Sequence, residues 1–255
     1  KTFYPGTPNE KKALNGVDLH LNAGDFVTIV GSNGAGKSTL FNAISGVFSV
    51  DEGTIRLDSK NITNMKEYKR AYDIGRLFQD TMKGTAPNMT IEENLALAYS
   101  RKAGKSFFAV NKQDREYFTE LLKQLDLGLE SRMKAKVGQL SGGQRQAVSL
   151  LMSTISQPKL LLLDEHTAAL DPATAQKVLD ITTRIVSEGR ITTMMITHDM
   201  QAALTLGNRT IMMDDGKIIF DISGEERAKM TVEDLLECYH ENSRKKLTND
   251  RMLLK

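Results

Sequence analysis

The stretch GSNGAGKST at residues 31–39 decides the fold of this chain. It matches the pattern G-x-x-x-x-G-K-[ST] and follows an apolar run, Phe26–Val30, that reads as a buried strand. Glycines let the backbone turn tightly with successive N–H groups facing inward, and a helix expected from about Ser38 adds partial positive charge. The pattern predicts a phosphate loop, with Lys37 reaching β- and γ-phosphates and the Ser38 hydroxyl binding Mg²⁺. The residues expected to bind the nucleotide are Ser32, Asn33, Gly34, Ala35, Gly36, Lys37, Ser38 and Thr39.

Two carboxylates follow a second apolar run. Asp164 and Glu165 come directly after Leu160–Leu163, which is typical of a central parallel strand. Because ligands of open α/β sheets bind at the carboxyl ends of strands, this position suits a nucleotide site. We expect Asp164 to hold Mg²⁺ through water and Glu165 to polarise the attacking water as a general base. A surface acidic pair at a strand end is the alternative interpretation.

The order of the expected elements predicts an α/β domain with a helical insertion. Capping signals open helices at Thr90–Glu93 and Asp171-Pro172, and Gly189 is where the second of these helices should end. The turn Asp215-Gly216 should join a hairpin. The expected strands are 17–21, 26–30, 160–163, 192–197, 211–214 and 217–220. The expected helices are 91–99, 112–125, 141–156 and 172–189, with others starting near 38 and 231.

Composition excludes several classes of protein. The chain has 255 residues, of which 40% are hydrophobic and 26% charged, as in ordinary globular proteins. A net charge of +2 argues against binding nucleic acid through bulk charge, and the single cysteine, Cys238, excludes a disulfide framework. No apolar run reaches the ~18 residues needed to cross a bilayer, and no secretory signal is visible. We expect an intracellular protein, and, since the sequence begins at Lys1 rather than Met, some native residues before it.

A second glycine-containing helix start lies at Leu140–Gln144, LSGGQ, which we name the signature segment. Ser141 is expected to cap the helix, while Gly142 and Gly143 expose N–H groups, so this is a second anion-binding helix end. One domain needs only one phosphate loop. The second therefore implies a γ-phosphate that is supplied by another copy of the chain.

With these segments in order, the chain resembles the ABC ATPase superfamily, specifically the nucleotide-binding subunits of ABC transporters. The resemblance implies an α/β, P-loop NTPase (RecA-like) core with an antiparallel β subdomain and an inserted α-helical subdomain. One ABC ATPase domain would cover residues 1–255, with a core lobe at about 1–81 and 157–255 and the helical subdomain at about 82–156. The matching motifs, in chain order, are the phosphate loop, the Q-loop Gln79, the signature segment, Walker B at Leu160–Asp164, Glu165, the D-loop at 169–171 and the switch histidine His198.

The resemblance also implies a head-to-tail homodimer that encloses two ATP molecules. Ser141, Gly143 and Gln144 of one copy would face the γ-phosphate bound by the other. Asp171 would cross the dimer interface as well as cap its own helix.

Further site roles follow from the same resemblance. Phe3 would stack on adenine, with Tyr4 as the alternative aromatic residue. Gln79 would contact Mg²⁺ and the attacking water, and His198 would hydrogen-bond the γ-phosphate; for both, a purely structural role is the alternative. One departure is His166, which follows Glu165 where the family commonly has proline. It either approaches the nucleotide or is a tolerated loop substitution.

The resemblance favours a transport motor. A separate transmembrane permease would be driven from the cytoplasmic face of the membrane, where this chain is peripheral. Residues 84–94 and 224–236 are similar to a bacterial branch of importers, so we expect an amino acid or similar small solute as cargo and a substrate-binding protein as a further partner. The alternatives are an export or lipoprotein-extraction ATPase, a non-transport ABC ATPase and an inactive regulator. Lys37, Asp164, Glu165 and His198 together disfavour the last of these.

Two outlying features have two interpretations each. Met82 and Met89 either form an apolar socket for the permease or fill the core. The basic tail at 243–255 either contacts anionic lipid headgroups or is a solvated terminus.

Overall fold

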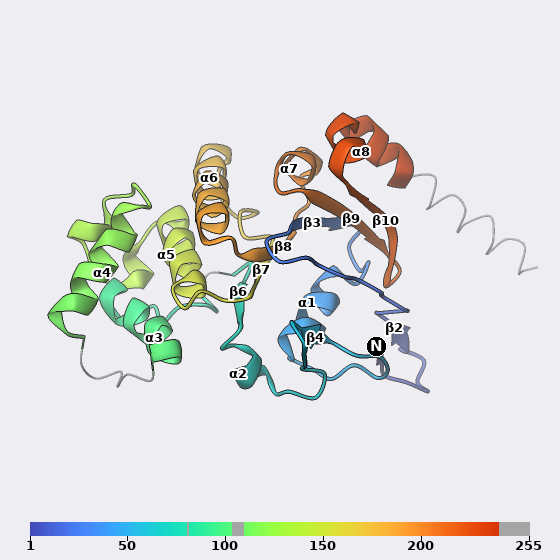
Figure 1. The fold of residues 1–255 in the computed structure, drawn as a ribbon, viewed down its shortest axis with the longest axis horizontal. Coiled ribbons are helices and arrows are strands. Elements are labelled where there is room, and N and C mark those ends of the chain that lie inside the picture. Colours follow the sequence, from blue (N-terminus) through green and yellow to red (C-terminus); the bar gives the residue numbers. More distant parts are fainter. Residues whose placement is uncertain (81, 104–109, 240–255) are drawn as a thin grey trace, which may run out of the picture. The chain divides into compact units, whose positions relative to one another are not determined.

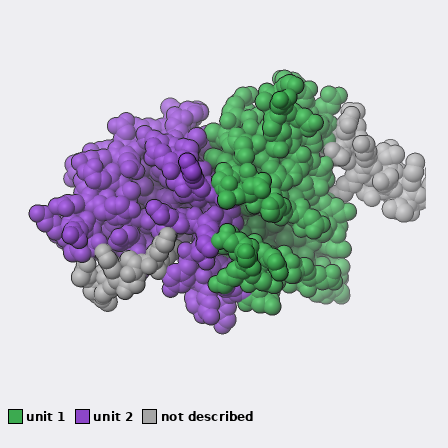
Figure 2. All heavy atoms as spheres, in the orientation of Figure 1, with its two compact units in different colours: residues 1–64, 194–255 green, residues 65–193 purple. Residues whose placement is uncertain are grey.

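The computed structural model describes residues 1–80, 82–103 and 110–239, and the chain divides into two compact units (Figure 2). Unit 1 contains Lys1–Asn64 and Met194–Lys255, and unit 2 contains Met65–Thr193. The subdomain boundaries expected near residues 82 and 156 stay a prediction. The basic tail at 243–255 lies outside the described residues.

Unit 1 is organised by three neighbouring strands (Figure 1). β3 (Phe26–Gly31) pairs in parallel with β9 (Arg209–Asp214), which pairs antiparallel with β10 (Lys217–Ser223). Five of the six β3 residues are buried, as expected for a strand covered on both faces. The hairpin turn predicted at Asp215-Gly216 is confirmed, and both residues have the positive φ that a type I′ turn requires.

Helices and short strand pairs complete unit 1. α1 begins directly after the phosphate loop, and the antiparallel pairs β1–β2 and β4–β5 are two residues per strand. Residues 232–239 are helical, as predicted for a helix starting near 231, and hydrogen bonds between Thr231 and Asp234 cap it. The remaining bounds are β1 (Thr2–Phe3), β2 (Lys11–Lys12), α1 (Lys37–Ser45), β4 (Arg56–Leu57), β5 (Lys60–Asn61), α7 (Met200–Thr205) and α8 (Gly224–Lys229). β8 (Thr192–Ile196) contains the boundary between the units.

Unit 2 joins two parallel strands to a group of helices. β6 (Ile74–Leu77) pairs in parallel with β7 (Leu160–Asp164), and α5 packs against β6, α3 and α6. Gly75 permits this close packing, since a Cβ there would lie 2.5 Å from the carbonyl oxygen of Ser153. Figure 1 shows α3, α4 and α5 grouped at one end of the unit. The helices are α2 (Glu67–Arg70), α3 (Ile91–Ala103), α4 (Lys112–Lys123), η1 (Leu129–Ser131), η2 (Val137–Gln139), α5 (Gly142–Thr154) and α6 (Pro172–Gly189).

Most predicted elements are confirmed within a few residues, with two exceptions. The strand expected at 17–21 is wrong: its side chains alternate in exposure, but the segment forms no strand. The helix expected to end at Tyr99 continues to Ala103, and β6 was not predicted. α6 does end at Gly189, but the left-handed residue that closes it is Arg190, with φ of 47°.

Candidate nucleotide-binding site

The phosphate loop leaves the start of α1 without a side-chain cap. The helix begins at Lys37, and its N-cap is Gly36, whose φ of 101° only glycine adopts readily. The Lys37 side chain is nearly buried, and its Nζ donates hydrogen bonds to the carbonyl oxygens of Gly31 (2.7 Å) and Ser32 (3.0 Å). An uncapped helix start beside a lysine ammonium is suited to an anion.

Two glycines of the loop are required by close backbone contacts within unit 1. A Cβ on Gly31 would lie 2.1 Å from the carbonyl oxygen of Met213 on β9, and one on Gly36 would lie 2.5 Å from the carbonyl oxygen of Ala13. The amide of Gly216 also donates to the carbonyl of Ala35 (2.9 Å). Close contacts with neighbouring backbone therefore fix the loop, in addition to the hydrogen bonds from the Lys37 side chain.

Phe3 and His198 belong to the same unit as the phosphate loop. The Phe3 ring meets Phe48 edge-on at 5.4 Å, whereas Tyr4 is 68% exposed. His198 is exposed and follows Thr197, whose amide donates to the carbonyl of Ile29 on β3. The backbone thus sets His198 beside the strand that leads into the loop.

The acidic pair lies in unit 2, at the carboxyl end of β7. Asp164 is the last residue of the strand, and Glu165 follows with φ of 46°. The Nε2 atom of Gln79 donates to Oε2 of Glu165 at 3.2 Å. The structure therefore brings together two predicted site residues that are far apart in sequence. A non-glycine residue in the left-handed region is strained, which is common at functional sites.

A basic residue that sequence reasoning missed lies beside Asp164. Arg76 on β6 is largely buried, and its Nη2 atom lies 3.9 Å from Oδ2 of Asp164. Its guanidinium also lies over the Phe78 ring at 4.7 Å. Burial lowers the pKa of Arg76, while Asp164 and Glu67 act in the opposite direction. The sequence signal that could have identified Arg76 is the presence of an arginine inside the apolar run that precedes Gln79.

The signature segment opens α5 with a complete capping box. Ser141 Oγ accepts from the Gln144 amide (3.3 Å), and Gln144 Oε1 accepts from the Ser141 amide (3.2 Å). Because the hydroxyl accepts this bond, its own proton can still be donated to a phosphate oxygen. Gly143 is buried, and a Cβ there would lie 2.3 Å from Cγ2 of Thr174 on α6. The predicted cap at Ser141 is confirmed.

Asp171 acts as a helix cap in this structure. Its Oδ1 atom accepts from the Thr174 amide at 3.1 Å, and hydrogen bonds from Thr174 lower the pKa of the carboxyl group. The side chain is exposed, so the cap leaves it accessible to a partner. Its role across a dimer interface stays a prediction.

His166 points into the interior of unit 2. It is 3% exposed, and its Nε2 atom lies 3.3 Å from Oγ1 of Thr182. That hydroxyl donates its proton to the carbonyl of Val178, so it accepts from His166, which puts the imidazole proton on Nε2. Burial lowers the pKa of His166 to about 4, so the ring is neutral at pH 7. These contacts favour the structural interpretation of His166.

Two features of the described residues bear on metal binding and on membrane insertion. Among those residues, no three or more His, Cys, Asp or Glu side chains cluster as a self-contained metal site. Within the same ranges, no helix has the length and apolarity needed to cross a bilayer.

Comparisons with known proteins agree on one family. The ABC transporter family model matches residues 14–168. A tyrosine transport ATP-binding protein of Clostridioides difficile (strain R20291) is 44% identical over 91% of this chain and 92% of that protein. A methionine import ATP-binding protein of Clostridium tetani (strain Massachusetts / E88) is 33% identical over 82% of this chain and 64% of that protein.

The fold is shared with solved structures as well. A dimeric ATP-binding cassette in a post-hydrolysis state, bound to ADP and Pi, is 30% identical with a TM-score of 0.75, over 88% of this chain and 95% of that chain. The P-loop NTPase fold expected from the sequence is confirmed, and ATP hydrolysis is the activity characteristic of these cassettes. This chain therefore belongs to the ABC transporter family, as an ATP-binding subunit that hydrolyses ATP.

Proposed function

We propose that this chain is the motor subunit of a bacterial importer for an amino acid or a similar small solute. The observation that carries the proposal is the 44% identity with a tyrosine transport ATP-binding protein, which extends over more than nine-tenths of both chains. The methionine import relative supports the same class of cargo. An ATPase subunit does not contact the solute, so the cargo is inferred from relatives and not from the site.

ATP binding is assigned to the phosphate loop. The β- and γ-phosphates would accept hydrogen bonds from the N–H groups at the uncapped start of α1 and from the ammonium of Lys37. The loop carbonyls already hold this ammonium in position. Ser38, Asp164 and Gln79 would hold Mg²⁺, which neutralises phosphate charge when it is bound. The Gln79 amide nitrogen donates to Glu165, which leaves the amide oxygen for the metal. Phe3 would stack on the adenine.

Hydrolysis is assigned to Glu165 with help from Gln79 and His198. Glu165 accepts a proton as the water oxygen attacks the γ-phosphorus and ADP departs. The hydrogen bond from Gln79 fixes the orientation of the carboxylate. His198 would donate to the γ-phosphate as negative charge develops there.

A head-to-tail homodimer completes each site. Ser141, Gly143 and Gln144 would meet the γ-phosphate bound by the partner copy, and Asp171 would link the two sites. The dimeric solved cassette, whose fold this chain shares, supports this assembly.

A separate permease would hold the dimer at the cytoplasmic face of the membrane, with a substrate-binding protein on the other side. Met82 is 43% exposed, which favours an apolar socket for the permease over a place in the core. Met89 is only partly exposed and does not distinguish the two interpretations.

The test starts with tagged Glu165→Gln protein as bait for detergent-solubilised native membranes, with and without Mg-ATP. We expect this variant to bind ATP but to lose roughly 10²–10⁴-fold in kcat, and to capture a multi-span membrane protein. Glu188→Gln, an exposed change on α6, is the matched control and should keep full activity. Capture of ribosomal or DNA-repair proteins without a membrane partner would contradict the transport assignment.

The cargo is tested in liposomes that contain the captured membrane protein reassembled with the unaltered chain. ATP-driven uptake of labelled tyrosine or methionine is the expected result, and the Glu165→Gln complex is the negative control. Uptake of phosphonate or sugar alone would overturn the amino-acid assignment while leaving the motor role intact.

A further inference from the structure

The chain segment that leads into the signature is hydrogen-bonded to residues 87–92, which precede and begin α3. We name residues 132–140 the lead-in segment. An isolated bridge joins Thr90 to Lys136, and backbone hydrogen bonds flank it on both sides. These are Ile91 N to Ala135 O (3.0 Å), Glu92 N to Met133 O (3.1 Å), Val137 N to Met89 O (3.0 Å) and Gly138 N to Pro87 O (2.9 Å).

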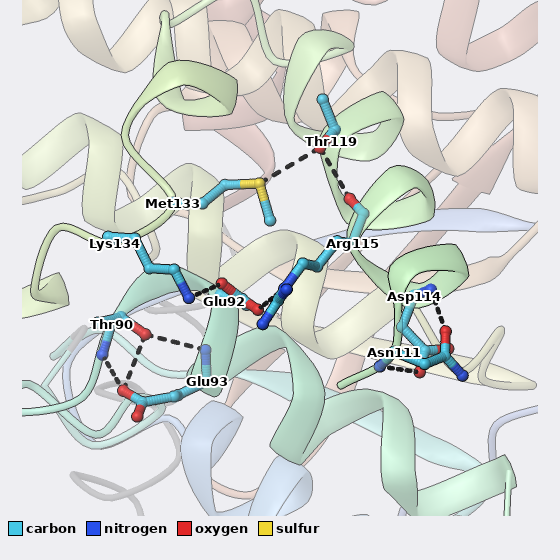
Figure 3. A network of polar contacts seen from close by, with 9 residues as sticks. All are labelled: Thr90, Glu92, Glu93, Asn111, Asp114, Arg115, Thr119, Met133 and Lys134. Atoms are coloured by element: carbon cyan, nitrogen blue, oxygen red, sulfur yellow. Dashed lines mark hydrogen bonds and ion pairs between the residues drawn. The ribbon is translucent and has the colours of Figure 1, made fainter. Parts of the chain in front are cut away.

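One buried carboxylate ties this segment to two helices (Figure 3). Glu92, in the first turn of α3, is 3% exposed. Its Oε1 atom accepts from Nε of Arg115 on α4, and its Oε2 atom lies next to Nζ of Lys134 in the lead-in segment, both at 2.6 Å. The two cations come from different parts of the chain, so Glu92 is the common partner of α3, α4 and the lead-in segment.

Because Glu92 is buried, its negative charge needs positively charged partners. A buried carboxylate without partners is strongly disfavoured, so its two cations are drawn to it. Both cations remain more than half exposed, which keeps their own desolvation small. Nearby, the Thr119 hydroxyl of α4 donates to the carbonyl oxygen of Arg115 at 2.7 Å and lies 3.3 Å from Met133 Sδ, so a second contact joins α4 to the same segment.

The end of the lead-in segment is rigidly coupled to α5. η2 covers 137–139, and Leu140 directly precedes the cap residue Ser141. From the first turn of α5, Arg145 donates back to the carbonyl oxygen of Leu140 at 2.9 Å. Hydrogen bonds therefore fix most of the backbone between Lys134 and Ser141.

We propose that Glu92 is a positioning residue for the signature segment: by clamping the lead-in segment to α3 and α4, it sets where Ser141 and Gly143 lie. The inference rests on the proposed dimer, in which these residues meet the partner's γ-phosphate. Loss of the clamp weakens ATP-driven dimerisation without changing ATP binding to the phosphate loop of a single copy.

The first experiment measures dimerisation of the Glu165→Gln protein with Mg-ATP by sedimentation velocity. Adding Glu92→Gln, which keeps the side-chain volume, should weaken dimerisation about fivefold to tenfold, with ATP affinity of the monomer unchanged. Lys134→Met, an exposed site that does not threaten folding, should weaken it in the same direction. The two changes together should cost less than their sum, because they remove one shared contact.

The matched control is Glu120→Gln on α4. This change removes an ion pair with Lys123 in which both side chains are more than half exposed. It should leave dimerisation unchanged, as such pairs contribute little. Equal losses from Glu92→Gln and Glu120→Gln would overturn the proposal, as would dimerisation within twofold of the parent.

A second readout does not depend on dimerisation. Hydrogen–deuterium exchange at the amides of Val137, Gly138 and Gln144 should accelerate in Glu92→Gln and stay unchanged in Glu120→Gln. Unchanged exchange at these amides would overturn the clamp itself. A Glu165→Gln parent that stays monomeric with Mg-ATP would instead contradict the proposed dimer, so the two failures are distinguishable.

Discussion

Two helices of this chain start at glycine-containing loops, and their N-termini are capped differently. α1 has Gly36 as its N-cap, makes no side-chain cap bond, and holds Lys37 against the loop carbonyls. α5 has Ser141 as its N-cap and a capping box with Gln144. At the start of α1 no side-chain cap accepts from the backbone N–H groups, whereas at the start of α5 a side chain of the same segment does.

The glycines of the two loops are also required for different structural reasons. A Cβ on Gly31 would clash with the backbone of β9, which is held in the sheet, and the φ of 147° at this position disfavours other residues. Gly143 instead meets a methyl group of Thr174, and Gly142 meets only the end of the Leu170 side chain. A glycine in these loops can therefore mark an unusual backbone conformation or close helix packing, and only the surrounding atoms distinguish the two.

The largest expected effect comes from removing the Lys37 ammonium at the uncapped start of α1. Lys37→Ala removes the ammonium assigned to the phosphates and should lower kcat/KM for ATP by roughly 10²–10³-fold. Lys12→Ala, an exposed lysine of the same unit, is the control and should change little. Steady-state ATPase assays check this; a Lys37→Ala protein within tenfold of the parent would contradict the assignment.

A second prediction compares glycines of the two loops by stability. Gly31→Ala should lower the free energy of unfolding by about 2–3 kcal/mol, since it adds both backbone strain and a clash with a carbonyl. Gly142→Ala should change it by less than about 0.5 kcal/mol, because a flexible side-chain end can shift. Urea titration of both variants measures the difference, and similar losses would show that the two loops are not distinct.

A third prediction asks whether Gly143 serves packing alone. Gly143→Ala should cost about 1–2 kcal/mol through its contact with Thr174, and Thr174→Ser, which deletes the opposing methyl group, should restore most of that. ATPase activity is then measured in the rescued double variant. Recovery of activity would show that Gly143 is needed only for packing, whereas continued loss supports close approach to the partner's phosphate.

The smallest expected effect is the change with pH in the stability that the Glu92 charge contributes. Burial raises the pKa of Glu92, but the hydrogen bonds from Lys134 and Arg115 outweigh it, so the folded-state pKa lies below the ordinary 4.5. Stability from this group is therefore present above the unfolded pKa and is lost as pH falls through the folded pKa.

Glu92→Gln should accordingly lower the melting temperature by about 2–4 °C at pH 7 and by less near pH 3 to 4. Calorimetry of both proteins at the two pH values checks this, with Glu120→Gln, which removes an exposed ion pair, as the matched control. A gap of the same size at both pH values would mean that the charge of Glu92 adds no stability.

Much of the fold was predictable because its signals are short-range. The caps at Thr90, Ser141 and Asp171 each join residues three apart, and all three are present in the structure. The turn at Asp215-Gly216 is equally local. The apolar alternation at 17–21 failed as a strand signal, because a strand also needs a pairing partner and alternation says nothing about one.

The sequence by itself determined the family, the phosphate loop and the helix caps, since each depends on residue types at fixed short spacings. Only the tertiary structure decided that Gln79 bonds Glu165, that Arg76 lies beside Asp164 and that His166 is buried. It also joined Glu92 to Arg115 and Lys134, 23 residues away in the first case. Such contacts arise when strands pair and helices pack, and the burial that then strengthens a charge is absent from the extended chain.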